Sequence, residues 1–387
     1  MDALGILGFD PFDKAFRADP YSHYARLRAA GPLSRTEAGL WVTTSYELCA
    51  QVLRDPRFGH AEAGAAWRPE VVRRRSFLSM NPPDHTRLRR LVSKAFSARL
   101  ISRLQPRIST LVDELLDGLT GEVDLIAALA YPLPVTLISE LLGVPAEDHE
   151  RFKGWSAALA RGLDPDFLLP PSVLERREQA RVEFGAYFRG LIAARRATPR
   201  DDLLSELVAV AELTEDELLA ICVLLLVAGH ETTVNLIGNG ALALLRDPAQ
   251  LGWFRARPGD GPAAVEELLR YDPPVQLTAR TALVPVELCG HAIEQGELVL
   301  LLTAAANRDP AAFPDPDKLD LVRPPKGHLA FGLGIHFCLG APLARLEGQI
   351  ALSALFQRDV QLRSGQLDYR DNIVLRGLAQ LPVVIRA

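Results

Sequence analysis

The sequence predicts a mainly α-helical protein with a small β-rich region. Three segments of its first half carry apolar residues at helical spacing and are divided by Pro or Gly, namely residues 108–119, 131–142 and 172–197. Short alternating segments are concentrated in residues 280–302 and return at 381–385, which is typical of strands. We therefore expect a large helical region and a few short strands.

Length and composition favour one large globular unit. The chain has 387 residues, of which 48% are hydrophobic and 24% charged, so it can bury a large core and carries no compositional sign of disorder. It contains no long Ser/Gly-rich linker, charge block or internal repeat at which to divide it. We expect a single domain over residues 1–387.

The chain carries no sequence pattern for secretion or membrane insertion. Asp2 and the lack of a basic start before an apolar core argue against a signal peptide. The longest uncharged apolar run, residues 218–229, is too short to span a bilayer. We expect a soluble cytoplasmic protein without membrane contact.

Residues 163–171, Leu-Asp-Pro-Asp-Phe-Leu-Leu-Pro-Pro, are predicted to form a loop between two helices. Apolar residues such as Phe167 in an exposed connection suit a lid over a binding site. A simple helix connection with a packed Phe167 is equally compatible with the sequence.

A long central helix is expected to begin after Thr214, which forms a capping box with Glu217. From Leu218 onward the helix is apolar nearly all round, so it should run through the interior. Its middle, Ala228-Gly229-His230-Glu231-Thr232-Thr233, places a Gly and two Thr where they are poor helix formers and where hydroxyls compete for backbone carbonyls. We expect a local opening of the helix there; the alternative is two core Thr residues that bond back to carbonyls.

The four cysteines, Cys49, Cys222, Cys289 and Cys338, show no Cys-x-x-Cys spacing, so neither a disulfide framework nor a zinc site is predicted. Burial as a small hydrophobic residue is the expectation for the first three.

Cys338 differs because residues 331–340, Phe-Gly-Leu-Gly-Ile-His-Phe-Cys-Leu-Gly, end just before the helical pattern of residues 341–355. A helix N-terminus stabilises a thiolate, which is the form of cysteine that binds a soft metal or attacks as a nucleophile. Gly332 and Gly334 allow close backbone approach, and Gly340 leaves room for a flat group.

Residues 331–340 resemble the haem-binding loop of the cytochrome P-450 family, Phe-x-x-Gly-x-[Arg/His]-x-Cys-x-Gly, at every fixed position. The resemblance implies the cytochrome P-450 fold, with haem b buried between the central helix and the cysteine loop. It makes Cys338 the ligand of the haem iron, and it places four further loop residues at the cofactor: Phe331, Gly332, His336 and Gly340.

The family's other signatures are similar to segments elsewhere in this chain and occur in the expected order. Residues 228–233 resemble the oxygen-activation segment, which implies that Ala228, Gly229 and Thr232 lie beside the haem. The resemblance assigns proton delivery to Glu231 and assigns to Thr232 the holding of oxygen and water by hydrogen bonds.

Glu267 and Arg270 resemble the family's Glu-x-x-Arg pair, with Arg323 as the expected third member. This Arg-Glu-Arg cluster would hold the cysteine loop in place, so its role is structural.

His85 and Arg89, four residues apart, share one helix face. The resemblance assigns both of them, together with Arg280 and His336, to binding of the two haem propionates, which need several cationic or polar donors.

The activity implied by the resemblance is that of a haem-thiolate monooxygenase. Such an enzyme inserts one oxygen atom from O2 into a mostly apolar small molecule, by hydroxylation or epoxidation. Soluble bacterial members suggest a polyketide or macrolide substrate in antibiotic biosynthesis. Substrate contacts are expected from residues 58–80, from Phe167, from the central helix before Ala228, and from residues 275–278.

The electrons must come from other proteins, because no Gly-x-Gly-x-x-Gly follows a predicted strand. A ferredoxin and a ferredoxin reductase are the implied partners. Between Arg68 and Arg107 the chain holds eleven basic and two acidic residues, a local net charge of +9 against −14 elsewhere. This stretch is a candidate docking surface for an acidic ferredoxin; a solvated helical face is the alternative.

Two other functions are compatible with parts of the pattern. A haem-thiolate peroxygenase would use hydrogen peroxide, but such enzymes usually lack the acid–alcohol pair seen here as Glu231 and Thr232. A non-enzymatic helical binding protein with a basic face for nucleic acid is the remote alternative. Because no nucleic-acid-binding module accompanies the charge, we expect no nucleic-acid partner.

Overall fold

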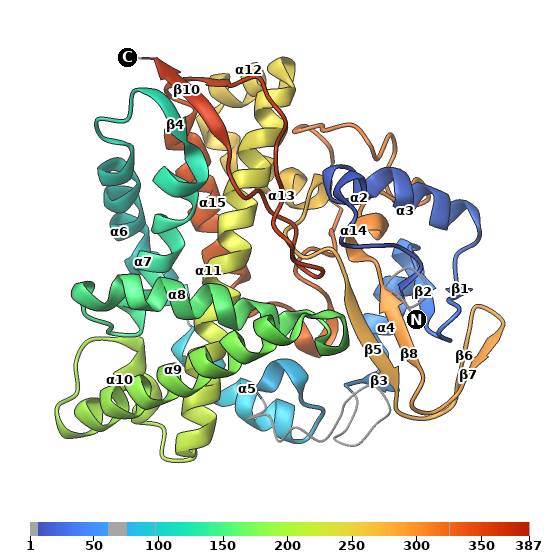
Figure 1. The fold of residues 1–387 in the computed structure, drawn as a ribbon, viewed down its shortest axis with the longest axis horizontal. Helices are drawn as coiled ribbons and strands as arrows, with labels where there is room; N and C mark the ends of the chain where they lie inside the picture. The colour runs from blue at the N-terminus through green and yellow to red at the C-terminus, as the bar shows by residue number, and fades with distance from the viewer. Residues whose placement is uncertain (1–6, 61–75, 97, 325, 387) are drawn as a thin grey trace.

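The computed structural model of the protein describes residues 7–60, 76–96, 98–324 and 326–386. Helices predominate and gather on one side of the molecule, while the main sheet and the first helices form the other side (Figure 1). This arrangement agrees with the predicted mainly helical fold with a small β-rich region. Residues 61–75, part of the expected substrate segment and of the basic stretch, lie outside the described residues.

The first half of the chain forms most of the peripheral helices. The long α9 coincides with the predicted helix 172–197 almost residue for residue, whereas α6 begins ten residues before the expected start at 108. The helices are α2 (Lys14–Ala18), α3 (Pro20–Ala29), α4 (Tyr46–Arg54), α5 (Asp84–Ala95), α6 (Ala98–Leu116), α7 (Pro132–Leu141), α8 (His149–Ala160), α9 (Pro171–Ala197) and α10 (Leu203–Val208).

The second half contributes the central helix α11 and the helices packed near it. These are α11 (Glu215–Arg246), α12 (Pro248–Ala256), α13 (Gly261–Tyr271), α14 (Thr303–Ala306) and α15 (Ala341–Leu355). Single turns of other helix types complete the set: η1 (Phe77–Ser79), η2 (Ile126–Ala130), η3 (Ala146–Asp148), η4 (Arg161–Leu163), η5 (Asp166–Leu168), η6 (Pro258–Asp260) and η7 (Gly334–His336).

The strands form one main sheet and two smaller ones. The main sheet has the order β1-β2-β8-β5-β3, in which β2 and β8 are parallel and the other neighbours antiparallel. Its strands are β1 (Ser34–Arg35), β2 (Trp41–Thr43), β3 (Phe58–Gly59), β5 (Thr278–Ala282) and β8 (Leu298–Leu301). The others are the sheet β4-β10-β9 (Gly121–Asp124, Pro382–Arg386, Asp359–Leu362) and the hairpin β6-β7 (Val286–Leu288, His291–Ile293).

The helix α11 is the centre of the helical region. The predicted capping box is confirmed, because the Thr214 hydroxyl accepts from the Glu217 N–H at 3.2 Å and the Glu217 carboxylate accepts from the Thr214 N–H at 2.9 Å. Among the described residues, α11 alone is long and apolar enough to cross a bilayer, but 72% of its most apolar window is buried inside the protein. It packs against α7, α8, α13 and α15, so its apolar character reflects a core position.

The predicted opening of the central helix was wrong. The helix α11 is continuous from Glu215 to Arg246. The Thr232 hydroxyl donates to the Ala228 carbonyl at 2.7 Å, and the Thr233 hydroxyl donates to the Gly229 carbonyl at 3.1 Å. Each hydroxyl thus donates a hydrogen bond within its own helical turn, and the helix stays closed. This arrangement is the alternative that the sequence left open, two core Thr residues that bond back to carbonyls.

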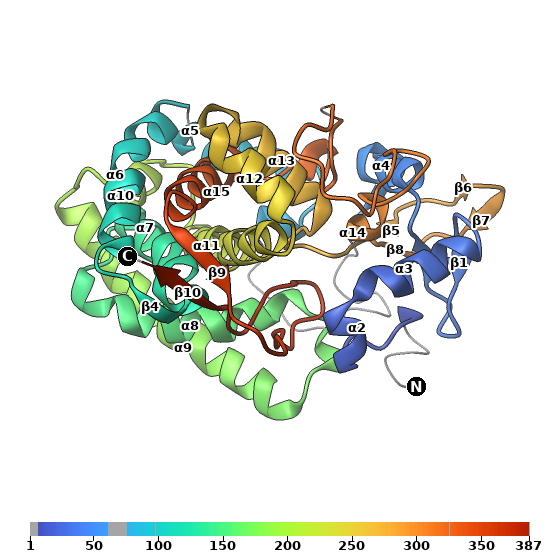
Figure 2. The same ribbon diagram turned by 90° about the horizontal axis from the view of Figure 1, so that it is seen from above.

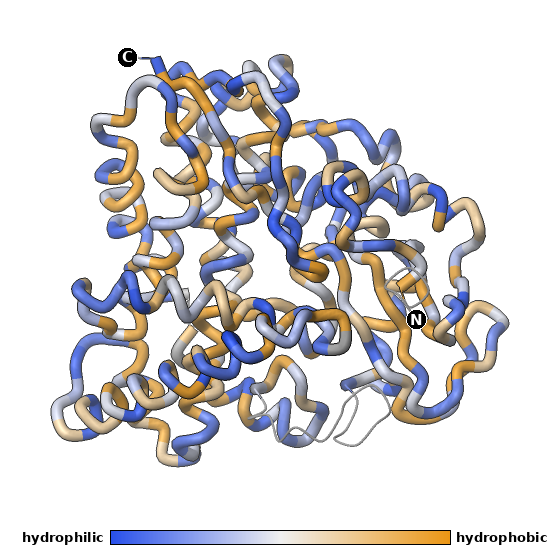
Figure 3. The backbone as a smooth tube through the Cα atoms, viewed as in Figure 1, coloured by the Kyte–Doolittle hydropathy of each residue, from blue (hydrophilic) through white to orange (hydrophobic). Residues whose placement is uncertain are grey.

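Apolar side chains form separate cores under the helices and under the main sheet. The larger core gathers buried residues from α5 to α11 and from α15. A second core lies between the main sheet and α4. Figure 3 shows β8 and β10 as mostly apolar strands, which fits their burial. Helical and sheet regions therefore each have apolar packing of their own.

A buried cluster of charges fastens the segment that leads to the cysteine loop. The Glu267 carboxylate accepts from Arg270 at 2.7 and 2.8 Å and from Arg323 at 3.2 Å. Arg270 also donates to the carbonyls of Asn307, Pro316 and Lys318. The predicted three-residue cluster therefore forms, and it ties α13 to residues 307–323.

Loss of Arg270 should destabilise the whole fold. Arg270→Met would leave the buried Glu267 carboxylate with one cation and would remove the side-chain donor of the Asn307 and Pro316 carbonyls, so we expect a loss of about 3–5 kcal/mol in unfolding free energy. Urea denaturation measures this loss. Lys318→Met is the control, because its ion pair with Asp315 is exposed and should change stability by less than about 0.5 kcal/mol. Equal effects of the two variants would contradict a structural role for the buried cluster.

Candidate active site

The loop of residues 331–340 folds back on itself directly before α15. The Cys338 N–H donates to the Phe331 carbonyl at 3.0 Å, which closes the loop. Gly332 and Gly334 have φ values of +67° and +69°, in the left-handed region that other residues rarely adopt. A Cβ on Gly334 would also overlap the Leu53 carbonyl oxygen, so glycine allows the close backbone approach that the sequence predicted, and the neighbour is α4.

The Cys338 thiol lies at the N-terminus of α15, as predicted, since Gly340 is the N-cap of that helix. Burial raises the pKa of the thiol, while the backbone N–H groups of Gly340 and Ala341 and the cations Arg89 and Arg345 act to lower it. A metal cation at the sulfur would add the missing stabilisation and keep the thiolate form.

The other three cysteines differ in their surroundings. Cys49 and Cys222 are buried, as expected, and burial raises the pKa of each thiol, for Cys222 to about 12. Cys289 is exposed, so the expectation of burial was wrong. It forms the two-residue turn between β6 and β7 with Gly290, and both residues have positive φ, so a hairpin turn takes it away from the core.

Four predicted donors from three separate elements come together beside the cysteine loop. His85 and Arg89 lie on α5, Arg280 on β5 and His336 in η7. The ring centroids of His85 and His336 are 4.2 Å apart. Burial, followed by the repulsion of Arg280, His85 and Arg89, lowers the pKa of His336 to about 3. The structure thus gathers positive or donor groups at one place.

These donors have no acidic partner among the described residues. The two ring nitrogens of His85 and Nδ1 of His336 are buried without a hydrogen bond. Arg280, only 7% exposed, donates to the Thr278 hydroxyl and the Ala279 carbonyl, and burial lowers its pKa to about 10. Arg89 donates to the Phe337 carbonyl. Because buried cations require compensation, the cluster fits a ligand that carries carboxylates.

One face of α11 borders an open space. Ala228 is exposed although it lies in the middle of a mostly buried helix, and Leu224 and Thr232, four residues away on either side, are partly exposed. Gly340 leaves room near the sulfur, since a Cβ there would lie 4.0 Å from Sγ of Cys338. A partly buried thiol, unpartnered donors and an open helix face together fit a haem with its propionates.

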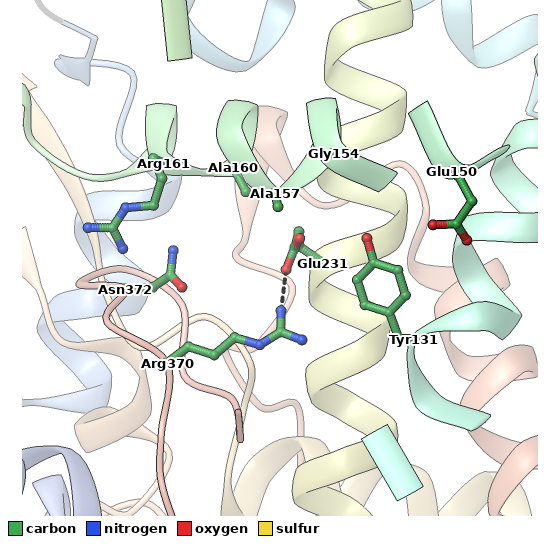
Figure 4. Close-up of a pocket in the computed structure, with 9 residues that line it drawn as sticks. All are labelled: Tyr131, Glu150, Gly154, Ala157, Ala160, Arg161, Glu231, Arg370 and Asn372. Atoms are coloured by element: carbon green, nitrogen blue, oxygen red, sulfur yellow. Dashed lines mark hydrogen bonds and ion pairs between the residues drawn. The ribbon is translucent and has the colours of Figure 1, made fainter. Parts of the chain in front are cut away.

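The Glu231 side chain lines a pocket beside α11 (Figure 4). This pocket has a volume of about 530 Å³ and is bordered by α8 and residues 370–372. Figure 2 shows α8 and the C-terminal segment on the side of α11 away from α15. The buried Glu231 carboxylate accepts from Arg370 at 2.8 Å. Burial raises the pKa of Glu231, and the charge and hydrogen bond of Arg370 counteract that rise.

His230 is a buried neutral neighbour of this acid. Its Nδ1 lies 2.6 Å from the Ser156 hydroxyl and 3.8 Å from the Glu231 carboxylate. Burial and then the charge of Arg370 lower the pKa of His230 to about 3, so it carries no charge at neutral pH. Arg370 is therefore the cation that balances Glu231.

Two residues of these sites have contacts that the sequence did not predict, although His60 lies in the segment 58–80 where substrate contacts were expected. Arg370 reaches Glu231 from a loop 139 residues away, so no spacing rule connects them. The His60 ring contacts His336, with centroids 4.7 Å apart, and its backbone is held by Asn81 through two hydrogen bonds of 2.8 Å. Only the fold brings His60 beside the cysteine loop.

Comparison with known proteins identifies the family. A family model described as cytochrome P450 matches residues 262–366. The chain is 43% identical to the cytochrome P450 monooxygenase PikC of Streptomyces venezuelae, over 98% of this chain and 93% of the relative. It is 40% identical to the 6-deoxyerythronolide B hydroxylase of Saccharopolyspora erythraea, over 95% of this chain and 96% of the relative.

A solved structure gives the same result. The ligand-free crystal structure of Mycobacterium smegmatis CYP164A2 matches with a TM-score of 0.91 and 48% identity, over 97% of this chain and 98% of that chain. The chain therefore belongs to the cytochrome P450 family. It has the fold of that family and is a P450 monooxygenase with haem b as its cofactor, which confirms the sequence-based predictions of family, fold class, enzyme class and cofactor.

The two glycines before the cysteine should differ in their tolerance of a side chain. Gly334→Ala adds a clash with the Leu53 carbonyl to the strain of a positive φ, whereas Gly332→Ala adds strain alone, because no neighbouring atom of the described residues lies within 4 Å of the place its Cβ would take. We expect Gly332→Ala to lose about 1–2 kcal/mol of stability and Gly334→Ala to lose at least about 1 kcal/mol more. Urea denaturation of the two variants measures the difference. Equal losses would mean that close contact with α4 does not determine the need for Gly334.

Proposed function

We propose that Cys338 is the thiolate ligand of the haem iron and that the chain oxygenates a mostly apolar small molecule. The observation that carries this assignment is the position of the thiol. It accepts two backbone N–H groups at the start of α15 and lies beside a cluster of donors that lacks acids. His85, Arg89, Arg280 and His336 would hold the haem propionates.

When bound, the haem would activate O2 and supply the oxidising chemistry, with its electronics set by the thiolate ligand. Thr232 borders the open space on α11, and its hydroxyl oxygen can accept a hydrogen bond from water while it donates to the Ala228 carbonyl. Glu231 would take a proton from the pocket on its side of α11 and pass it toward Thr232. The chain's share is therefore to hold the cofactor and to control protons and water.

The substrate that we propose is a polyketide or macrolide of secondary metabolism, modified by hydroxylation or epoxidation. A relative that covers nearly the whole chain is named as a hydroxylase of 6-deoxyerythronolide B. The face of α11 before Ala228 carries the partly exposed Leu224, and the segment before β5 carries the partly exposed Val275, so apolar side chains are available at two of the predicted contact positions. Phe167 and residues 61–75 remain part of this proposal from sequence alone.

For electrons we propose a ferredoxin and its reductase, which would place the enzyme in the cytoplasm. The helix α5 carries Arg90 and Lys94, which are exposed and form no ion pair with any residue of the described ranges. The same helix carries Arg89, which donates to a carbonyl of the cysteine loop. An acidic protein bound to α5 would thus lie close to Cys338.

The spectrum of the reduced protein with carbon monoxide tests the ligand assignment. The wild type should show the long-wavelength Soret band of thiolate-ligated ferrous haem, and Cys338→Ser should lose it, because an alcohol oxygen is a much poorer donor of electron density to the iron. Cys222→Ser is the matched control and should retain the band, since that thiol is buried away from the loop. An unchanged spectrum of Cys338→Ser would refute the assignment.

Reduction kinetics test the docking surface. Arg90→Glu and Lys94→Glu should each lower the rate of reduction by an acidic ferredoxin, and the loss should be largest at low ionic strength, where charges are least screened. Stopped-flow measurement over a range of salt concentrations gives both effects. Lys14→Glu, an equally exposed cation on α2, should leave the rate and its salt dependence unchanged. The docking proposal fails if the α5 variants behave like Lys14→Glu.

A further inference from the structure

We propose that residues 370–374 couple the α8–α9 linker to Glu231, with Arg370 as the positioning residue that holds the Glu231 carboxylate toward the solvent-accessible pocket. The inference rests on the proposed role of Glu231 in proton delivery and adds to it a residue and a route of control. Two contacts at opposite ends of this short segment carry the argument.

The first contact fixes Glu231. Its buried carboxylate receives a hydrogen bond of 2.8 Å from Arg370, whose side chain is partly exposed in the pocket. Figure 4 shows the Arg370 guanidinium reaching Glu231 across the pocket from the C-terminal segment. The ion pair therefore favours the ionised carboxylate and holds it at the pocket.

The second contact anchors the other end of the segment. Asp164, in the linker between η4 and η5, accepts from the N–H groups of Ile373 and Val374, both at 3.0 Å. Its side chain is fully buried, and Arg161 pairs with it at 3.2 Å while also donating to the Asp371 carbonyl. The linker is thus bonded directly to the segment that carries Arg370.

The remaining groups around Glu231 do not replace Arg370. His230 on the same helix is neutral, because its pKa is lowered to about 3. Tyr131, before α7, and Glu150, on α8, line the same pocket but bring no positive charge. Arg161 lines it as well, but its contacts are with Asp164 and the Asp371 carbonyl. A displacement of residues 370–374 would therefore change the charge balance of Glu231 directly.

This geometry links two events of the reaction cycle. If the linker moves when substrate enters, Ile373 and Val374 move with Asp164 because they are hydrogen-bonded to it. This displacement weakens the ion pair between Arg370 and Glu231. The carboxylate then takes up a proton from pocket water and can turn toward Thr232 as a neutral acid. Once the acid has passed this proton toward Thr232, the carboxylate that remains forms the ion pair with Arg370 again when the linker is seated.

Infrared titration of the haem-loaded, substrate-free enzyme tests the coupling. The Glu231 carboxyl band is identified by difference from Glu231→Gln, and its protonation is followed against pH. Removal of the cation in Arg370→Gln should move the Glu231 midpoint to higher pH, and Arg370→Lys should restore it in part. An unchanged midpoint in Arg370→Gln would overturn the positioning role.

Substitution of two acids in the same linker distinguishes coupling to Glu231 from a general loss of structure. Asp164→Ala removes the carboxylate oxygen, Oδ1, that accepts from both the Ile373 and Val374 N–H groups, and it should also move the Glu231 midpoint upward, although Asp164 does not touch Glu231. Asp166→Ala removes a paired acid two residues away, bonded to Arg177, and should leave the midpoint in place. If Asp164→Ala matches Asp166→Ala, the coupling is wrong. Because the band reports a carboxyl group and no turnover, this outcome is independent of the Cys338→Ser spectrum.

Discussion

A cluster of donors without acids is the feature on which the rest of the site depends. His85, Arg89, Arg280 and His336 are brought into a largely buried place where no described carboxylate balances them. Arg89 and Arg280 are the cations of this cluster, and because burial of a cation without a counter-charge costs several kcal/mol, an anionic partner from outside the chain would stabilise it. The donors come from the helical region and from the main sheet. A haem held by them would therefore join these two regions as well as supply the chemistry.

The same constraint explains how the cysteine loop is supported. Burial raises the pKa of the Cys338 thiol and so disfavours the thiolate. The backbone N–H groups of the loop and nearby cations counteract this rise. Those groups act only if the loop keeps its shape. Gly334 allows contact with α4, and the Glu267 cluster fixes the preceding segment to α13. The structural cluster and the cluster of donors beside the cysteine loop are therefore separate, and of these two only the structural one contains an acid among the described residues.

The sequence predicted the parts of the fold that local physics determines. The start of α11 followed from Thr214 and Glu217, and the start of α15 from the pattern after Cys338. Strands β1 to β4 were not predicted, because two to four residues carry too short a pattern and their pairing depends on distant partners. Cys289 was misplaced because a hairpin turn overrides its apolar character. Motif resemblance located most of the candidate site, whereas Arg370 and His60 enter it by tertiary contact alone.

The geometry of α11 gives a physical reason why Thr232 and Glu231 have different roles. Ala228 and Thr232 border the open space, while Glu231 leaves the helix toward solvent and Arg370. An apolar substrate requires a dry space, because water there would weaken its binding and compete for the reactive oxygen. A proton requires the opposite, a continuous path to water. A single helix can serve both only if its side chains face different compartments and one group crosses between them. Burial raises the pKa of the Glu231 carboxyl and the nearby cation Arg370 counteracts that rise, so this group has the chemistry to make that crossing.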